Sequence, residues 1–388
     1  MKIKQLPDDF IVEEIPSITF SKEKQDHQIY LMEKTEMDTF EALRRISNHF
    51  QIPTHDIGYA GLKDKHAITR QYISIPNKYH IDTKKLQSPI LKIMGYHTSR
   101  LSIGDLSGNR FTIIIRDLTY KKIKEVTETT KAIQTYGVPN YFDSQRFGSV
   151  IHNEFIMKYI LQNNFEKAMK IFLTFYEKHE RKKIKDDKRS VEAHWNDLSK
   201  TKIRNTVFKN IINTYLETDD WQQAYMMVPR NLRELHKNAF QSYIWNECIK
   251  ELLKKLLGPS NLFPIKYHVG TLLFYQQLTK QQAKLIPETF KTVSPKETYT
   301  ALENDMISKV LFKQGIRQQD LDIKSKTGVY LSSLERQVIL KPTEFSGTQP
   351  TKDPLNSSDQ SMRNKVQISF ILPKGSYATM ITKGIFHK

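Results

Sequence analysis

The order in which helix-like and strand-like segments follow one another constrains the fold of this chain most. Residues 366–372 alternate apolar with polar side chains, which is typical of a strand with one buried face. This strand pattern returns only after a long, mainly helical middle portion. The first third mixes both types: residues 110–116 and 71–75 are β-rich, and residues 38–50 combine helical spacing with a capping-box pattern. We therefore predict an α+β fold with a mixed or antiparallel sheet, interrupted by a mostly helical α+β insert.

The boundaries of the insert follow from changes in pattern. Helical periodicity dominates after Gly148 and is clearest over residues 231–257, where it ends at Gly258, a good C-cap residue. Residues 342–364 are rich in Ser, Thr, Pro, Asp and Asn without periodicity, which predicts a loop or linker. We place the discontinuous domain at residues 1–149 and 342–388, and the insert at residues 150–341.

Charge and cysteine content limit the class of protein. The 60 Lys and Arg outnumber the 42 Asp and Glu, giving a net charge of +18 that favours a polyanionic partner such as nucleic acid. The charged N-terminus lacks the apolar stretch of a secretory signal, and no apolar run approaches bilayer-spanning length. Cys248, the only cysteine, cannot form an internal disulfide and is expected to be buried. We expect a cytoplasmic protein without membrane contact, and we assume a monomer.

The segment Gly58–Gln71, GYAGLKDKHAITRQ, carries the most informative chemistry. Its glycines and lysines do not have P-loop or dinucleotide-binding spacing. What remains is Asp64 between Lys63 and Lys65. Such a run is most often a solvated turn. Alternatively, the two cations favour an ionised carboxylate, which can act as a covalent catalyst. The histidines have no ligand-type spacing, so no metal is predicted.

Six segments in the same order carry a resemblance to a known family. They are KQLPDDFIVEE (4–14), GYAGLKDKHAITRQ (58–71), LSIGDLSGNRFTIIIR (101–116), GVPNYFDSQRFG (137–148), NAFQSYIWN (238–246) and LPKGSYAT (372–379). Through them the chain resembles the TruD family of tRNA pseudouridine synthases, over nearly its whole length. The resemblance implies a pseudouridine synthase-type catalytic domain interrupted by the TRUD insertion domain.

The resemblance also implies a reaction. Asp64 would be the catalytic aspartate, acting on an everted uridine of tRNA whose base detaches from C1′, rotates and rejoins through C5. The family relationship points to position 13, in the D-arm region. Asp64 could bond to C1′, add to C6 of uracil or remove a ribose proton, and the sequence leaves these routes open. An isomerisation needs no cofactor, so none is predicted.

Four further residues take roles from the resemblance. Lys4 would hold the carboxylate of Asp64 ionised and aimed. Phe111 would offer a stacking face to the everted base, and Asn109 would offer a donor and an acceptor to uracil or to the catalytic loop. Arg146, among aromatic residues, is a candidate RNA contact. Taken singly, each also has a purely structural interpretation: a solvated lysine, a core phenylalanine, an Asn-stabilised turn and aromatic packing around Arg146.

Two other functions remain open. A non-catalytic RNA-binding or chaperone protein would keep the same fold and basic surface. A uridine methyltransferase would need a methyl-donor site and commonly a reactive cysteine, for which Cys248 in an apolar helix is a poor candidate. The charged stretch 178–189, with seven Lys or Arg against three Asp or Glu, is either a solvated helix face or a contact for tRNA phosphates.

Overall fold

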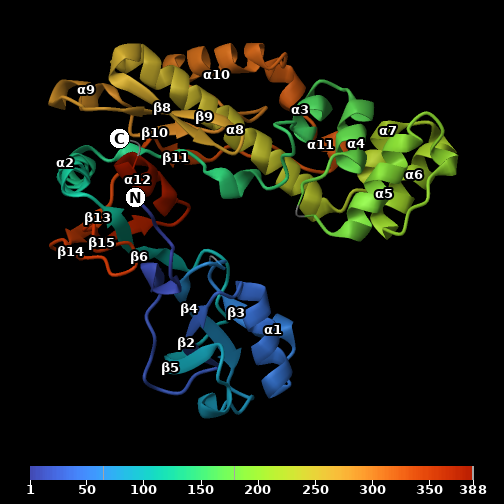
Figure 1. Ribbon diagram of the computed structural model, residues 1–388. Coiled ribbons are helices and arrows are strands. Elements are labelled where there is room, and N and C mark those ends of the chain that lie inside the picture. Colours follow the sequence, from blue (N-terminus) through green and yellow to red (C-terminus); the bar gives the residue numbers. More distant parts are fainter. Residues whose placement is uncertain (64, 179, 387–388) are drawn as a thin grey trace. The chain divides into compact units, whose positions relative to one another are not determined.

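The computed structural model describes residues 1–63, 65–178 and 180–386. The chain divides into two compact units: unit 1 comprises Met1–Gly137 and Leu340–Lys388, and unit 2 comprises Val138–Ile339 (Figure 1). Among the described helices, none has the length and apolar character that a membrane crossing requires.

Unit 1 is organised around one mixed sheet. Its strands are β1 (Phe10–Pro16), β2 (His27–Thr35), β3 (Gly58–Tyr59), β4 (Ile68–Pro76), β5 (Ile90–His97), β6 (Leu106–Leu118), β13 (Thr343–Gly347), β14 (Thr351–Lys352) and β15 (Asn364–Pro373). The order is β13-β15-β6-β1-β4-β2-β5, with β14 paired to β15 and β3 to β4. β1 and β4 run parallel, whereas the other neighbouring strands of this sheet pair antiparallel. The predicted α+β class with a mixed sheet is confirmed.

Helix α1 (Thr39–Phe50) covers one face of the strands that follow it (Figure 1). The predicted start is correct, because the side chain of Asp38 accepts a hydrogen bond from the amide of Glu41. Glu41 itself pairs with Arg45 at 2.6 Å, so its side chain has a partner within the helix. The inward face of α1, including Leu43 and Ile46, packs on buried residues of the sheet such as Ile73. This packing fixes the helix N-terminus beside the start of β4.

The end of the chain completes the sheet of unit 1. The predicted strand 366–372 lies within β15, which pairs with β6 along its length, and α12 (Ala378–Phe386) follows and packs against α2 (Tyr120–Tyr136). The prediction of a loop over residues 342–364 is wrong in part, because β13 and β14 lie there and pair with β15. Their short length and exposed side chains hide the strand pattern from sequence.

Unit 2 is mainly helical, with short strand pairs. Its helices are α3 (Ile156–Leu161), α4 (Phe165–Thr174), α5 (Lys182–Ala193), α6 (Thr206–Thr218), α7 (Trp221–Met226), α8 (Arg230–Leu257), α9 (Lys280–Leu285), α10 (Ala301–Lys313) and α11 (Lys324–Thr327). The strand pairs are β7 (Val138–Pro139) with β12 (Ile339–Leu340), β8 (Leu262–Tyr267) with β9 (Gly270–Tyr275), and β10 (Thr289–Lys291) with β11 (Glu335–Gln337). The predicted long helix over residues 231–257 is confirmed as α8, with Gly258 at its C-cap.

The NAFQSYIWN segment lies in α8 and packs inside unit 2. Asn246 both accepts from the amide of Phe142 and donates to its carbonyl, each at 2.9 Å. The Nε1 of Trp245 donates to the carbonyl of Phe290, and Gln241 donates to the carbonyls of Val293 and Ser332. Because these side chains are buried, helix packing accounts for the motif.

Candidate active site

Asp64, the predicted catalytic residue, lies outside the described residues. The described residues that precede position 64 form a loop, residues 60–63. This loop and the strands that contact it make up the candidate site. These residues all belong to unit 1.

A buried ion pair holds the side chain of Lys63. Its Nζ lies 2.5 Å from Oε2 of Glu14, and the two side chains are only 5% and 0% exposed. Oε1 of Glu14 also accepts from the amide of Tyr72 at 3.2 Å. Burial raises the pKa of Glu14 above its ordinary value, and the ammonium of Lys63 acts in the opposite direction. Lys63 is therefore not part of a solvated turn but an anchor for the loop.

The backbone of the same loop is held by a chain of neutral hydrogen bonds. Oγ1 of Thr39, at the start of α1, accepts from the amide of Lys63 at 3.0 Å and donates to Oε1 of Gln71 at 3.1 Å. Nε2 of Gln71 donates to the carbonyl of Gly61 at 3.1 Å. Thr39 and Gln71 are both buried. Elements α1 and β4 thus hold the loop at two points, immediately before position 64.

Asn109 stands next to this ion pair. On β6 it is directly opposite Glu14 of β1 and Leu372 of β15. Its Oδ1 is buried and, within the described part of the chain, accepts no hydrogen bond. A buried acceptor left without a donor is costly, so this atom is available to accept a hydrogen bond from a bound group.

Phe111 lies two residues further along β6, on the same face as Asn109. Its ring contacts Phe10 at 6.2 Å and Phe370 at 5.7 Å between centroids, and the residue is 8% exposed. Most of the ring is thus buried in the core, which agrees with the interpretation of Phe111 as a core phenylalanine. Its stacking role stays a prediction.

Lys4 approaches the same aromatic cluster from the N-terminus. Its Nζ lies 3.9 Å from the centroid of the Phe10 ring, a cation–π contact, and Phe10 in turn contacts Phe111. Lys4 has a φ of +57°, in the left-handed region that non-glycine residues rarely adopt. Such a conformation persists only where neighbouring contacts impose it.

Those contacts come from a buried network around Arg116 of β6. Its guanidinium donates to Asp9 at 2.8–2.9 Å and to Asp353 at 3.0 Å. Asp9 also accepts from the amides of Gln5 and Leu6, which directly follow Lys4. On the other side of Lys4, the backbone of Lys2 exchanges two hydrogen bonds with that of Arg116. The network therefore fixes the backbone on both sides of Lys4.

The sequence patterns do not single out Glu14 or Asp353. A signal for Glu14 exists, because Phe10, Val12 and Glu14 share the inward face of β1, and a carboxylate on a buried face needs a partner. For Asp353 there is none, because its partner Arg116 is more than 200 positions away in the chain.

Arg146 belongs to unit 2, where its Nε donates to Oγ of Ser242 at 3.0 Å. Its guanidinium also lies over the ring of Phe142. The aromatic residues around it pack within unit 2, with Tyr141 and Phe147 fully buried. The RNA contact stays a prediction.

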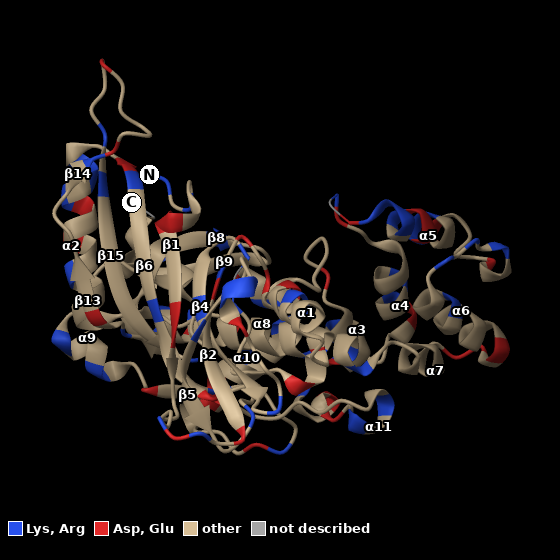
Figure 2. Cartoon of the chain, turned by 90° about the horizontal axis from the view of Figure 1, so that it is seen from below, with Lys and Arg blue, Asp and Glu red and all other residues tan. Residues whose placement is uncertain are grey.

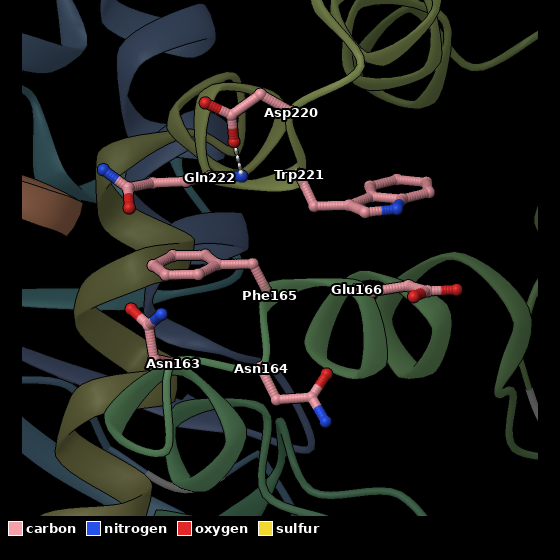
Figure 3. Close-up of a pocket in the computed structure, with 7 residues that line it drawn as sticks. All are labelled: Asn163, Asn164, Phe165, Glu166, Asp220, Trp221 and Gln222. Carbon is pink, nitrogen blue, oxygen red and sulfur yellow. Dashed lines mark hydrogen bonds between the residues drawn. The ribbon is translucent and has the colours of Figure 1, made fainter.

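Unit 2 also contains a surface cavity of about 520 Å³ (Figure 3). It is lined by Asn163, Asn164, Phe165, Glu166, Asp220, Trp221 and Gln222. Two carboxylates among these residues disfavour an RNA phosphate. Across the described residues, no group of three or more His, Cys, Asp or Glu is arranged to hold a metal ion.

Comparison with known proteins gives one consistent result. A family model described as "tRNA pseudouridine synthase D (TruD)" matches residues 1–266 and 274–385. The chain is 38% identical to "Probable tRNA pseudouridine synthase D 2" of Methanocaldococcus jannaschii, with 100% of this chain and 92% of the relative covered. It is 29% identical to "tRNA pseudouridine synthase D" of Aquifex aeolicus, covering 100% and 98%.

A solved structure agrees with the sequence comparisons. A crystal structure from Methanosarcina mazei, whose description names tRNA pseudouridine synthase D (TruD), superposes with a TM-score of 0.73 at 25% identity. The match covers 100% of this chain and 93% of that one. The family match spans nearly all the residues that form both units, and the predicted resemblance is confirmed: the chain belongs to the tRNA pseudouridine synthase D (TruD) family.

Proposed function

We propose that this protein isomerises uridine to pseudouridine in tRNA, at position 13 in the D-arm region, with Asp64 as the reacting carboxylate. The observation that carries the proposal is the doubly anchored loop of residues 60–63, beside the buried Oδ1 of Asn109, which accepts no hydrogen bond from a described residue. Anchors on the residues that precede a reacting group limit the reorganisation that the transition state requires. Family membership supplies the reaction class.

The reaction balances without an external reagent. The bond between N1 and C1′ breaks, a bond between C5 and C1′ forms, C5 loses its proton and N1 gains one. Asp64 would begin this sequence at C1′, at C6 or at the ribose proton. Each route starts from the ionised carboxylate. Lys4 favours that charge by its own positive charge and is the predicted partner.

Asn109 suits the recognition of uracil. Uracil offers a donor at N3–H between two carbonyl acceptors, and an Asn side chain carries both an acceptor and donors. Oδ1 of Asn109, which accepts no hydrogen bond from a described residue, matches N3–H. Phe111, two residues along the same strand face, would contact the base with the exposed part of its ring.

The basic surface suits tRNA as the partner. With a net charge of +18, the protein attracts a polyanion over long range. In unit 2, basic positions gather on α5 and just before it, where Arg181, Lys182, Lys183 and Arg189 are exposed (Figure 2). Arg146 and this helix are the proposed phosphate contacts of unit 2.

Tritium release tests the proposal. With tRNA carrying tritium at C5 of uridine, the protein is expected to release tritium to water, because the new bond at C5 displaces that hydrogen. Asp64→Asn is expected to abolish the release while tRNA binding is retained. Absence of release by the wild-type protein on a competent tRNA pool would contradict the proposal. Mapping pseudouridine by nucleotide in the product tests position 13.

The same experiment separates the alternatives. A non-catalytic RNA-binding protein would release no tritium, and Asp64→Asn would leave its RNA-dependent effects intact. Methylation at C5 also displaces the hydrogen but requires a methyl donor, so release without any donor argues for isomerisation. Cys248 is fully buried, and burial raises the pKa of its thiol well above the ordinary value, which disfavours a thiolate nucleophile.

A further inference from the structure

Three large apolar side chains gather at the loop of residues 60–63 and are mostly exposed to solvent. Phe40 is 58% exposed, Leu62 59% and Ile103 78%. Single exposed apolar residues are common on soluble proteins and need no explanation. Here the three come from separate segments of unit 1 that lie in or beside one loop, the one that leads to position 64. We call these three residues the apolar rim.

Each member of the apolar rim lies in the loop or in a segment that contacts it or the residue before it. Leu62 belongs to it. The ring of Phe40 meets the ring of Tyr59, the residue before Ala60, edge to face at 6.3 Å between centroids. Beside Ile103, the amide of Gly104 donates to the carbonyl of Ala60 at 2.9 Å.

The segment that carries Ile103 is a well-bonded turn. The amide of Asp105 donates to the carbonyl of Ser102 at 3.1 Å, and Oδ2 of Asp105 accepts from the amide of Ser102 at 2.7 Å. Gly104 has a φ of +104°, as the third residue of a type II turn requires. Ile103 is thus held at the tip of a rigid turn, where it is exposed and adds little to the core.

Cations accompany the apolar rim. Nζ of Lys374 donates to the carbonyl of Gly104 at 3.1 Å, which places an ammonium beside Ile103. Lys65 is exposed just beyond position 64. Apolar side chains next to cations suit the stacked bases and phosphates of a nucleic acid better than a protein surface.

We propose that the apolar rim contacts the bases next to the target uridine and replaces the stacking that they lose when the uridine leaves the RNA helix. The inference rests on the proposed function. Leu, Ile and Phe side chains are known to wedge between base steps, where they offset the cost of unstacking. The apolar rim has this role here. It separates the bases beside the target uridine, while the residues of the candidate site act on the everted base.

The test compares kcat/KM for tritium release from tRNA among rim variants. Ile103→Ser and Phe40→Ser are each expected to lose about tenfold, given the usual strength of base stacking on a side chain. Ile103→Met, which keeps an apolar side chain of similar reach, is expected to restore activity. Circular dichroism and thermal unfolding confirm that each variant is folded.

Tyr120→Ser is the matched control. Tyr120 is 87% exposed, so its side chain is as accessible as that of Ile103. Ile103 precedes β6, whereas Tyr120 follows the opposite end of that strand. It is expected to match the wild type. Equal activity of the Ile103, Phe40 and Tyr120 variants would overturn the inference.

Altered RNA supplies the second arm. In tRNA transcripts with mismatches beside the target uridine, unstacking requires less free energy. The activity of the rim variants on these transcripts is therefore expected to approach that of the wild type. An equal loss on paired and mismatched RNA would indicate a structural defect and overturn the inference. Failure of the wild-type protein on every transcript would instead contradict the proposed function.

Discussion

At the scale of single residues, the adjacent glutamates Glu13 and Glu14 have opposite environments. They are neighbours on β1, so their side chains point to opposite faces of the sheet. Glu14 is buried with Lys63, whereas Glu13 pairs with Arg70 at 2.8 Å with both side chains about one-third exposed. The two residues therefore allow the anchor of the loop to be tested against a nearly identical change.

Glu14→Gln is expected to lower kcat for tritium release strongly and to change KM little. The substitution leaves the buried ammonium of Lys63 without its counter-charge, so the loop before position 64 loses one of its anchors. A displacement of about 1 Å in a reacting group can cost about 100-fold in rate. Steady-state kinetics of both variants measure this, with Glu13→Gln as the control. Similar kinetics for the two would show that the Glu14–Lys63 pair does not position the loop.

The site residues that the sequence proposes lie in compact segments. Through the family resemblance, the GYAGLKDKHAITRQ and GDLSGNRF segments give Asp64, Asn109 and Phe111 as candidates, and their roles stay predictions. What sequence does not predict is which partner satisfies each buried charge. The sequence predicts that Lys63 acts on Asp64, but its ammonium is paired with Glu14, a contact between the loop and a strand distant in sequence that no local pattern encodes.

At the scale of elements, segments far apart in sequence fix the N-terminal residues. Arg116 on β6 joins Asp9, just before β1, to Asp353, which follows β14. Sequence predicts β15 correctly because its alternation is long, but it treats residues 342–364 as a linker. Asp353 lies there, and burial in this network gives it a structural role that composition hides.

Asp353→Asn is expected to lower the free energy of unfolding by about 3 kcal/mol, the usual effect of breaking a buried ion pair on one side. Activity is expected to fall as well, because the network holds the backbone around Lys4. Urea unfolding followed by circular dichroism measures the first effect.

Glu344→Gln, on β13, provides the control, because the partners of both carboxylates lie on β6. Glu344 pairs with Arg110 of β6, six positions before Arg116, but this pair is exposed to solvent. Exposed pairs contribute less than about 1 kcal/mol. A loss of stability no greater for Asp353→Asn than for Glu344→Gln would contradict a structural role of the network.

At the scale of the whole molecule, the two units can be followed separately. The chain has three tryptophans, Trp195, Trp221 and Trp245, and all three lie in unit 2. Tryptophan fluorescence therefore reports the unfolding of unit 2, whereas circular dichroism reports both units. His236 and Glu251 are buried groups of unit 2 whose pKa values are shifted downward, to about 4 and about 2.

The two groups act in different pH ranges. Burial lowers the pKa of His236 from 6.5 to about 4, so below pH 6.5 the unfolded chain binds a proton that the folded chain does not. Burial alone would raise the pKa of Glu251, but Lys309, Lys313 and Lys254 lower it from 4.5 to about 2. The stability from Glu251 is complete above pH 4.5 and is lost only as the pH falls toward 2. Between pH 6.5 and 5, only His236 of this pair weakens unit 2.

We therefore expect the free energy of unfolding of unit 2 to fall by about 2 kcal/mol from pH 6.5 to pH 5, from a slope of about 1.4 kcal/mol per pH unit. His236→Leu removes the buried imidazole, whose Nδ1 has no hydrogen-bond partner within the described residues, and is expected to flatten this dependence. Urea unfolding followed by tryptophan fluorescence at several pH values measures it. His66→Leu, at an exposed position of unit 1, is the control and is expected to keep the wild-type slope. An unchanged slope in His236→Leu would mean that other groups cause the acid sensitivity of unit 2.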